Sequence, residues 1–432
     1  MIGKHLFWDR SILTDTLAVV HEVMDYVDDQ SKKGVLRSDF YDSTLLLIAE
    51  ILPYVEAQDP WTDLGYRICR SFKASMETDG YQRQTSVFGG FTSKCFAVNA
   101  FCQQANILPS FARSMNQMLF FNLEERLKRF PTAPVRDSNH DLISGVSNTL
   151  YYLLDFENSQ EEKRILIRCL EYLVGLTRDT VYHGKPIIAF HVLQPNQNPN
   201  FDQELFHDGN LNFGLAHGML GPLIAMAKAY SMGIVVAGLR EGIERIYHLY
   251  ETYQLVDAEN IPHWPGTMTV EEYWEGACKP EHLHSCSSWC YGNVGIIRGL
   301  QKVATYMGWK QKESHYINAM KSLLAQDSAK YNLFSPSICH GFSSLVFLQT
   351  CAYASYRDRG LLTNLERNVR QLITEYKRSN EREVNIQDIL DQKVWVEGYL
   401  GELSLLTGSI GVAITLLSLR GSTRTSKLLM ID

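Results

Sequence analysis

A glycine followed three residues later by another small residue opens an apolar stretch six times in this chain. The first glycines of these pairs are Gly90, Gly145, Gly218, Gly292, Gly341 and Gly408. They are 55, 73, 74, 49 and 67 residues apart, and each interval has room for a helical hairpin with its loops. Self-similarity at this spacing predicts stacked helix pairs. Small residues at a helix start allow the close backbone approach that inner helices around a shared axis would need.

Helical periodicity supports this interpretation. Apolar residues recur three and four positions apart in residues 12–27, 43–55, 165–176 and 239–253. Six or seven hairpins could close into an α/α toroid or stay open as a solenoid. The run 403–419 has no charged side chain, and such a run would be hard to cover at the end of a solenoid. We therefore expect an all-α fold, a toroid formed by a single domain over residues 1–432.

Three segments need a separate interpretation. Residues 181–206 contain short β-like runs between turn formers, which predicts a small irregular or β-containing insertion. Residues 219–239 and 403–419 are long and apolar, but both follow the glycine repeat, so we expect buried helices rather than membrane spans.

The net charge and the number of cysteines limit the classes of protein to which this chain can belong. The formal net charge of −7 and the lack of a basic stripe argue against nucleic-acid binding. Acidic residues interrupt any apolar core near the N-terminus, which argues against a signal peptide and favours a cytoplasmic protein. Nine cysteines, an odd number, favour buried thiols and metal ligands over a disulfide framework.

Candidate ligands and proton carriers stand just before four of the repeat glycines. They are Asp141, His217, Cys290, Tyr291, Cys339 and His340. One phase of the repeat corresponds to one end of a toroid, so residues up to 199 positions apart (141 to 340) would face a common cleft. Taken singly each has a simpler interpretation: a helix N-cap for Asp141, a core histidine for His217, a packed aromatic for Tyr291. The shared phase favours a site.

The donor set indicates a particular metal. Two thiolates and one imidazole suit zinc, and three protein ligands leave a fourth position for a substrate. Cys290, Cys339 and His340 are therefore predicted to bind one Zn²⁺ ion.

Three motifs resemble those of the lanthipeptide (lantibiotic) synthetase C-type cyclase family. They are Ser288-Trp-Cys-Tyr-Gly292, Ile338-Cys-His-Gly341 and Gly214-Leu-Ala-His-Gly-Met-Leu-Gly-Pro222. The resemblance implies an α/α toroid with a small SH2-like insertion, which we place near residues 181–206. It also implies that Cys290, Cys339 and His340 hold zinc, that His217 and Asp141 handle protons, and that Tyr291 lines the site.

The resemblance further implies a substrate and partners. The substrate would be a lantibiotic precursor peptide whose Ser and Thr residues are already dehydrated, and the reaction would be intramolecular addition of its cysteine thiolates to dehydroalanine or dehydrobutyrine. A dehydratase and an exporter would be partners, which makes peripheral association with the inner face of the cell membrane an expectation.

One position departs from the family pattern. An arginine usually stands four residues before the first zinc cysteine, and here that residue is Cys286. On a helix Cys286 and Cys290 would share a face, so Cys286 could complete a closed, structural zinc site. The alternative is a small pocket residue. His282 and His284 are interpreted as loop histidines, with metal ligation as the alternative.

Three other functions remain open on the sequence. A glutathione-adding thiol transferase acting on dehydrated residues would share every motif. A non-catalytic helical-repeat scaffold would use the zinc structurally. A glycoside hydrolase would need two carboxylates across the cleft, and Asp141 is the one acidic residue in the repeat phase.

Overall fold

Two concentric layers of helices make up the protein. The computed structural model describes residues 10–78, 85–131, 134–199, 201–381, 397–421 and 423–432. Within these residues the inner layer consists of α2 (Tyr41–Ile51), α4 (Phe91–Ala105), α7 (Ser147–Leu153), α9 (Leu220–Ser231), α12 (Asn293–Met307), α14 (Phe342–Tyr356) and α17 (Ser409–Ser418). The outer layer consists of α1 (Arg10–Lys32), α3 (Asp59–Thr78), α5 (Pro109–Leu127), α8 (Gln160–Leu176), α10 (Leu239–Thr252), α13 (Lys310–Ala325) and α15 (Leu365–Glu381).

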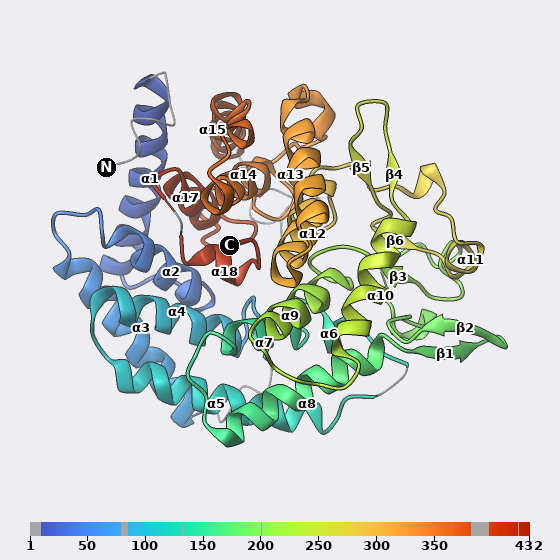
Figure 1. Cartoon of the computed structure of the whole chain (residues 1–432). Helices are drawn as coiled ribbons and strands as arrows, with labels where there is room; N and C mark the ends of the chain where they lie inside the picture. The colour runs from blue at the N-terminus through green and yellow to red at the C-terminus, as the bar shows by residue number, and fades with distance from the viewer. Residues whose placement is uncertain (1–9, 79–84, 132–133, 200, 382–396, 422) are drawn as a thin grey trace.

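The inner helices form a closed ring (Figure 1). α17 packs on α2, so the last inner helix meets the first, and α1 covers α17 from outside. Between α4 and α7 the hydroxyl groups of Thr92 and Thr149 lie 2.8 Å apart. The predicted toroid is confirmed, and the open solenoid is wrong.

Burial patterns explain why each helix takes its layer. The buried residues of the outer helix α10 include Leu239, Ile243, Ile246 and Tyr250, which repeat at three- and four-residue intervals and form one face. The inner helix α14 is buried on all sides from Phe342 to Ala352. An inner helix has neighbours on every side, so its sequence carries no polar stripe.

Each of the six repeat glycines lies within two residues of the start of an inner helix. A Cβ atom on Gly292 would lie 2.0 Å from the backbone nitrogen of Ser288, and one on Gly341 would lie 2.2 Å from the carbonyl oxygen of Ser335. These glycines therefore allow the loop before the helix to fold back on itself, rather than allowing neighbouring helices to approach. α2 begins without such a glycine, so the repeat did not reveal it.

The β-structure consists of three separate two-stranded pairs within the described residues. β1 (Asp179–Tyr182) pairs with β2 (Lys185–Ile188), β3 (Leu211–Asn212) with β6 (Thr267–Met268), and β4 (Leu255–Val256) with β5 (Pro262–His263), all antiparallel. All lie on one side of the ring, together with α11 (Val270–Glu275) (Figure 1). A β-hairpin at residues 179–188 overlaps the predicted insertion, but strands also occur well beyond residue 206. Its 181–206 limits, its likeness to an SH2 domain and the single-domain extent 1–432 stay predictions.

None of the helices described here is long and apolar enough to span a membrane. The two apolar runs noted in the sequence contain the inner helices α9 and α17, as expected.

The last ten residues occupy the centre of the ring. They include the short helix α18 (Thr425–Leu428), whereas the other short helix, α6 (Asp137–His140), lies in the loop before α7. Trp289 Nε1 donates to the carbonyl of Leu429 (3.1 Å), and Asn148 Nδ2 donates to that of Leu428 (2.6 Å). Trp289 immediately precedes Cys290, so this segment supports the base of the predicted metal site.

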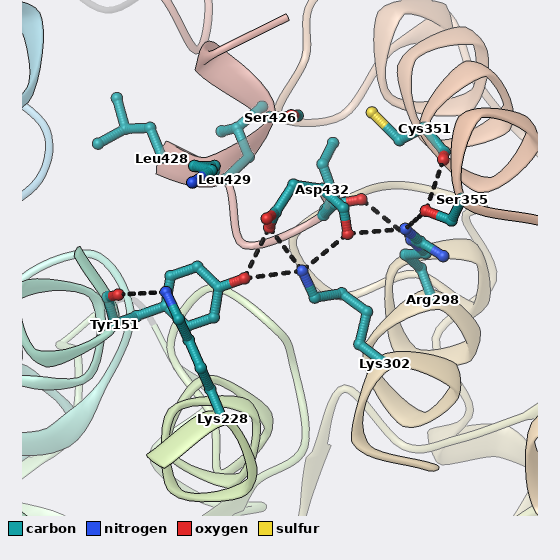
Figure 2. Close-up of polar contacts among 12 residues, drawn as sticks. Tyr151, Lys228, Arg298, Lys302, Cys351, Ser355, Ser426, Leu428, Leu429 and Asp432 are labelled. Carbon is teal, nitrogen blue, oxygen red and sulfur yellow. Dashed lines mark hydrogen bonds and ion pairs between the residues drawn. The ribbon is translucent and has the colours of Figure 1, made fainter. Parts of the chain in front are cut away.

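Asp432 lies in a polar network inside the ring (Figure 2). Lys302 Nζ is 2.5 Å from its Oδ1, the hydroxyl of Tyr151 donates to the same oxygen (2.7 Å), and Arg298 Nη2 donates to its main-chain oxygen (2.8 Å). Burial would raise the pKa of Asp432, but the charge of Lys302 outweighs it and holds the pKa far below 3.8. Because the folded-state pKa is depressed, this stabilisation is present at neutral pH. It is lost as the pH falls below 3.8, the ordinary pKa of an aspartate side chain.

Replacing Asp432 with alanine is expected to lower the free energy of unfolding by about 3 kcal/mol, because it leaves the buried Lys302 without its counter-ion. Chemical denaturation would measure the change, and Asp432→Ala combined with Lys302→Met should recover part of it. Asp28→Ala, which breaks an exposed pair with Lys32, is the control and should leave the free energy of unfolding nearly unchanged. Equal effects of the two single variants would contradict the importance of the central network.

Candidate metal centre and proton-transfer site

A chain of backbone hydrogen bonds links the loops that precede the inner helices. The residue two positions before one repeat glycine donates its N–H to the carbonyl of the corresponding residue in the next loop. Ile143 donates to Ala216 (3.3 Å), Ala216 to Cys290 (3.1 Å), and Cys339 to Leu406 (3.0 Å). Residues at one phase of the repeat are therefore neighbours at one end of the ring.

This chain of bonds has a gap between Cys290 and Cys339. No backbone hydrogen bond between these two loops is present at this phase in the described residues. Instead, the side chains of Cys290, Cys339 and His340 converge there, with one ligand atom of each within 4.8 Å of the others. The Sγ of Cys339 and the Nε2 of His340 are 3.5 Å apart. Two sulfurs and a ring nitrogen at this spacing fit a tetrahedral zinc ion.

Glu397 fixes the orientation of His340 from the opposite side. Its carboxylate lies 3.3 Å from His340 Nδ1, while its other oxygen accepts hydrogen bonds from Ser335 (2.7 Å) and Ser337. A histidine that binds zinc through one ring nitrogen commonly donates its other N–H to a carboxylate. Sequence reasoning missed Glu397, which comes eleven residues before its repeat glycine and so falls outside the phase used for the search.

The electrostatics of the group favour an ionised sulfur. Hydrogen bonding to Cys290 and to Glu397 raises the pKa of His340 to about 10. Burial would raise the pKa of the Cys290 thiol, but hydrogen bonds from Cys339 and His340 outweigh burial and bring this pKa well below 9.0. Thiolate is the form of cysteine that binds zinc, so the surroundings of Cys290 favour the ligand form.

His217 and Asp141 form a hydrogen-bonded pair beside this group. The Nδ1 of His217 lies 2.7 Å from Oδ2 of Asp141. The other oxygen of Asp141 accepts from the backbone N–H groups of Ser144 (2.7 Å) and Gly145 (2.5 Å). Asp141 is 1% exposed, whereas the His217 side chain is 40% exposed, so a fixed carboxylate supports a histidine that a substrate can reach.

The charge of Asp141 alters the acidity of His217. Burial alone would lower the pKa of His217, but the hydrogen bond and negative charge of Asp141 outweigh it and raise the pKa above 6.5. Because Asp141 accepts from Nδ1, the Nε2 nitrogen is the one left for proton transfer.

Tyr291 lines the same region. Its ring centroid is 6.2 Å from that of His217 and 5.8 Å from that of His284. Asn212 Nδ2 donates to its hydroxyl over 3.3 Å, and burial raises the pKa of this hydroxyl, so Tyr291 is neutral at physiological pH. The predicted site residues thus come together from four loops of the ring.

Comparison with known proteins assigns the family. The model of the family described as lanthionine synthetase C-like protein matches residues 45–430, which is most of the chain. The chain belongs to the lanthionine synthetase C-like family.

Individual members of this family support the assignment. Nisin biosynthesis protein NisC from Lactococcus lactis subsp. lactis is 25% identical over 273 residues, or 61% of this chain and 62% of that protein. The aligned part thus spans about three fifths of the length of this curated relative. A solved structure of nisin cyclase has the same fold, with a TM-score of 0.80 and 18% identity over 95% of this chain and 97% of that one.

In this lanthionine synthetase C-like protein, Cys286 takes the position where an arginine was expected. It lies outside the group of candidate metal ligands. It does not belong to the close cluster of ligand atoms found in the described residues, which contains Cys290, Cys339 and His340. Burial raises the pKa of Cys286 to about 11, so its thiol is neutral and supplies no positive charge. This geometry favours the pocket-residue interpretation over the closed four-ligand site.

Proposed function

We propose that this protein closes thioether rings in a dehydrated lantibiotic precursor peptide, by intramolecular addition of cysteine thiolates to dehydroalanine or dehydrobutyrine. The observation that carries the proposal is the meeting of three zinc-type ligands and a histidine–aspartate pair at one end of the ring. The His340 side chain is 51% exposed, which gives a substrate access to the ligand group.

The ligand group would hold the cofactor. Cys290, Cys339 and His340 would bind zinc, and a bound zinc ion lowers the pKa of a coordinated thiol so that it persists as thiolate near neutral pH. Glu397 holds the imidazole of His340 in the orientation that presents Nε2 to the two sulfurs.

The proton-transfer pair would complete the reaction. A C–S bond forms between the peptide sulfur and the β-carbon, and the electron pair of the C=C bond moves toward the neighbouring carbonyl oxygen to give an enolate. Protonated His217 then supplies a proton to the α-carbon from Nε2, while Asp141 keeps the ring oriented and stabilises its positive charge. Tyr291 restricts the space beside His217. The peptide thiol releases one proton to solvent when it ionises, and the α-carbon gains one from His217, which is then reprotonated from solvent. The net change is an isomerisation, with no oxidation or reduction.

Incubation with a dehydrated, cysteine-containing precursor tests this proposal. We expect alkylatable thiols to disappear while the peptide mass stays unchanged. Persistence of the thiols with fully zinc-loaded protein would refute it. A dehydrated peptide without cysteine, mixed with glutathione, tests the thiol-transferase alternative, because an adduct would raise the mass by one glutathione.

The remaining partners are proposed on family grounds. A dehydratase must act first, because the acceptor carbon exists only after Ser or Thr has lost water. Association with this dehydratase and with an exporter at the inner face of the cell membrane would be tested by co-purification of the three proteins.

The pH dependence of ring closure provides a separate prediction. Protonated His217 is the active form, so kcat should fall as the pH rises through its raised pKa. Asp141→Asn removes the negative charge and should move this decline to lower pH by about one to two units. A pH–rate profile of both proteins, with zinc content measured at each pH, would check this shift; superimposable profiles would contradict the role of the pair.

A further inference from the structure

His284 occupies a fixed position beside the candidate site. Its backbone N–H donates to the carbonyl of Trp264 (3.1 Å), and a β-bridge joins the adjacent residues Leu283 and Pro265. A Cβ atom on Gly266 would lie 3.4 Å from His284 Nδ1 and 3.4 Å from Cδ1 of Tyr291. The imidazole is thus held against the Gly266 backbone and the ring of Tyr291.

The Nε2 atom of His284 is buried and has no hydrogen-bond partner in the part of the chain that the structure describes. Buried polar atoms nearly always have a partner, because leaving one unpaired opposes folding. Its ring centroid is 5.8 Å from that of Tyr291, which directly follows Cys290 in the chain, so the imidazole lies beside the ligand group. An unpaired nitrogen at this location suits a hydrogen bond to a bound substrate.

His282, two residues before His284 in the same loop, differs from His284 because its imidazole has a hydrogen-bond partner. Its Nδ1 lies 2.9 Å from a carboxylate oxygen of Glu272, and that carboxylate is fully buried. Glu272 also accepts from the backbone N–H groups of Thr269 (3.0 Å) and Lys279 (2.7 Å). His282 therefore has a structural partner, and the two histidines that the sequence grouped as loop residues have separate roles.

The protonation state of His284 suits a donor that keeps its proton. Burial lowers the pKa of His284, and the charge of His340 lowers it further, against the opposing effect of Cys290. The imidazole is therefore neutral at physiological pH, with one nitrogen carrying a proton and the other an acceptor. A neutral N–H can stabilise a developing oxyanion without transferring a proton to it.

We propose that His284 is a further catalytic residue, whose Nε2–H donates a hydrogen bond to the carbonyl oxygen of the dehydrated residue under attack. This proposal rests on the proposed function. Negative charge develops on that oxygen when the C–S bond forms, and it disappears when His217 protonates the α-carbon. Cys286 stands at the position of the family arginine and carries no positive charge, so no cation is present at that position of the loop.

Two substitutions at His284 separate hydrogen bonding from shape. His284→Phe removes the donor and keeps a planar ring, whereas His284→Gln places an amide N–H near the position of Nε2. We expect kcat to fall about a hundredfold in His284→Phe, with KM changing much less, and to recover by at least about tenfold in His284→Gln. His282→Asn, whose amide replaces the Nδ1 donor to Glu272, is the matched control and should retain wild-type kcat.

Two measurements that do not depend on turnover complete the test. His284→Phe should keep its full zinc content, and its melting temperature should stay the same or rise, because an unpaired buried polar atom is replaced by carbon. Loss of zinc, a lower melting temperature, or equal kcat in the Phe and Gln variants would overturn the proposal, as would wild-type kcat in His284→Phe. If wild-type protein itself leaves the thiols unreacted, the proposed function fails and this role fails with it; a failure confined to the variants concerns His284 alone.

Discussion

Replacing Cys339 with alanine is expected to remove nearly all bound zinc and to slow ring closure on the order of a thousandfold. The side chain supplies one of two thiolates, and a remaining Cys–His pair would hold the metal weakly. Cys339 is only partly buried, so its truncation removes little packing and the helical ring should stay folded. Metal analysis, circular dichroism and the thiol-alkylation assay on one preparation would measure all three effects.

Cys286→Ala is the matched control for this experiment. It removes a thiol from the same region but from outside the close ligand group, so zinc content and rate should stay near those of the wild type. Zinc loss and unfolding in Cys286→Ala would instead support the scaffold with a closed, structural zinc site. Normal ring closure by metal-free Cys339→Ala would show that the metal takes no part in the reaction.

The second large effect is expected at His217. His217→Asn should lower kcat by about a hundredfold to ten-thousandfold, the usual contribution of a general acid. Asparagine is chosen because its amide can still donate to Asp141 at the position of Nδ1, while it offers nothing at the position of Nε2. Zinc content and peptide affinity should change little, since His217 is not in the ligand group.

Tyr291→Phe provides the comparison for His217→Asn. It removes a hydroxyl whose hydrogen bond with Asn212 is long, at 3.3 Å, and keeps the ring that packs beside His217. We expect less than about a tenfold loss of kcat, because no proton-transfer group is removed. If His217→Asn is no slower than Tyr291→Phe, another group protonates the α-carbon.

Much of the architecture could be predicted because local sequence patterns determine it. The outer helices have one apolar face, and the glycine before each of six inner helices is required by a loop that closes on its own backbone. The glycine repeat did not predict α2 because this helix follows a 3-10 turn (Ser38–Phe40) and needs no glycine before Tyr41. The strand pairs beyond residue 206 were not predicted because a two-residue strand is too short to show an alternation of apolar and polar residues.

For the site, the sequence by itself determined which residues carry the chemistry and at which phase of the repeat they stand. Cys290, Cys339 and His340 could be named because they stand at one phase of the repeat, and in a closed ring one phase lies at one end. Only the tertiary structure decided that Glu397 orients His340, that Cys286 lies outside the ligand group, and that His284 rather than His282 has an unpaired nitrogen. These are contacts between side chains on different loops, whose distances depend on how the hairpins pack, and no local pattern in the sequence encodes them.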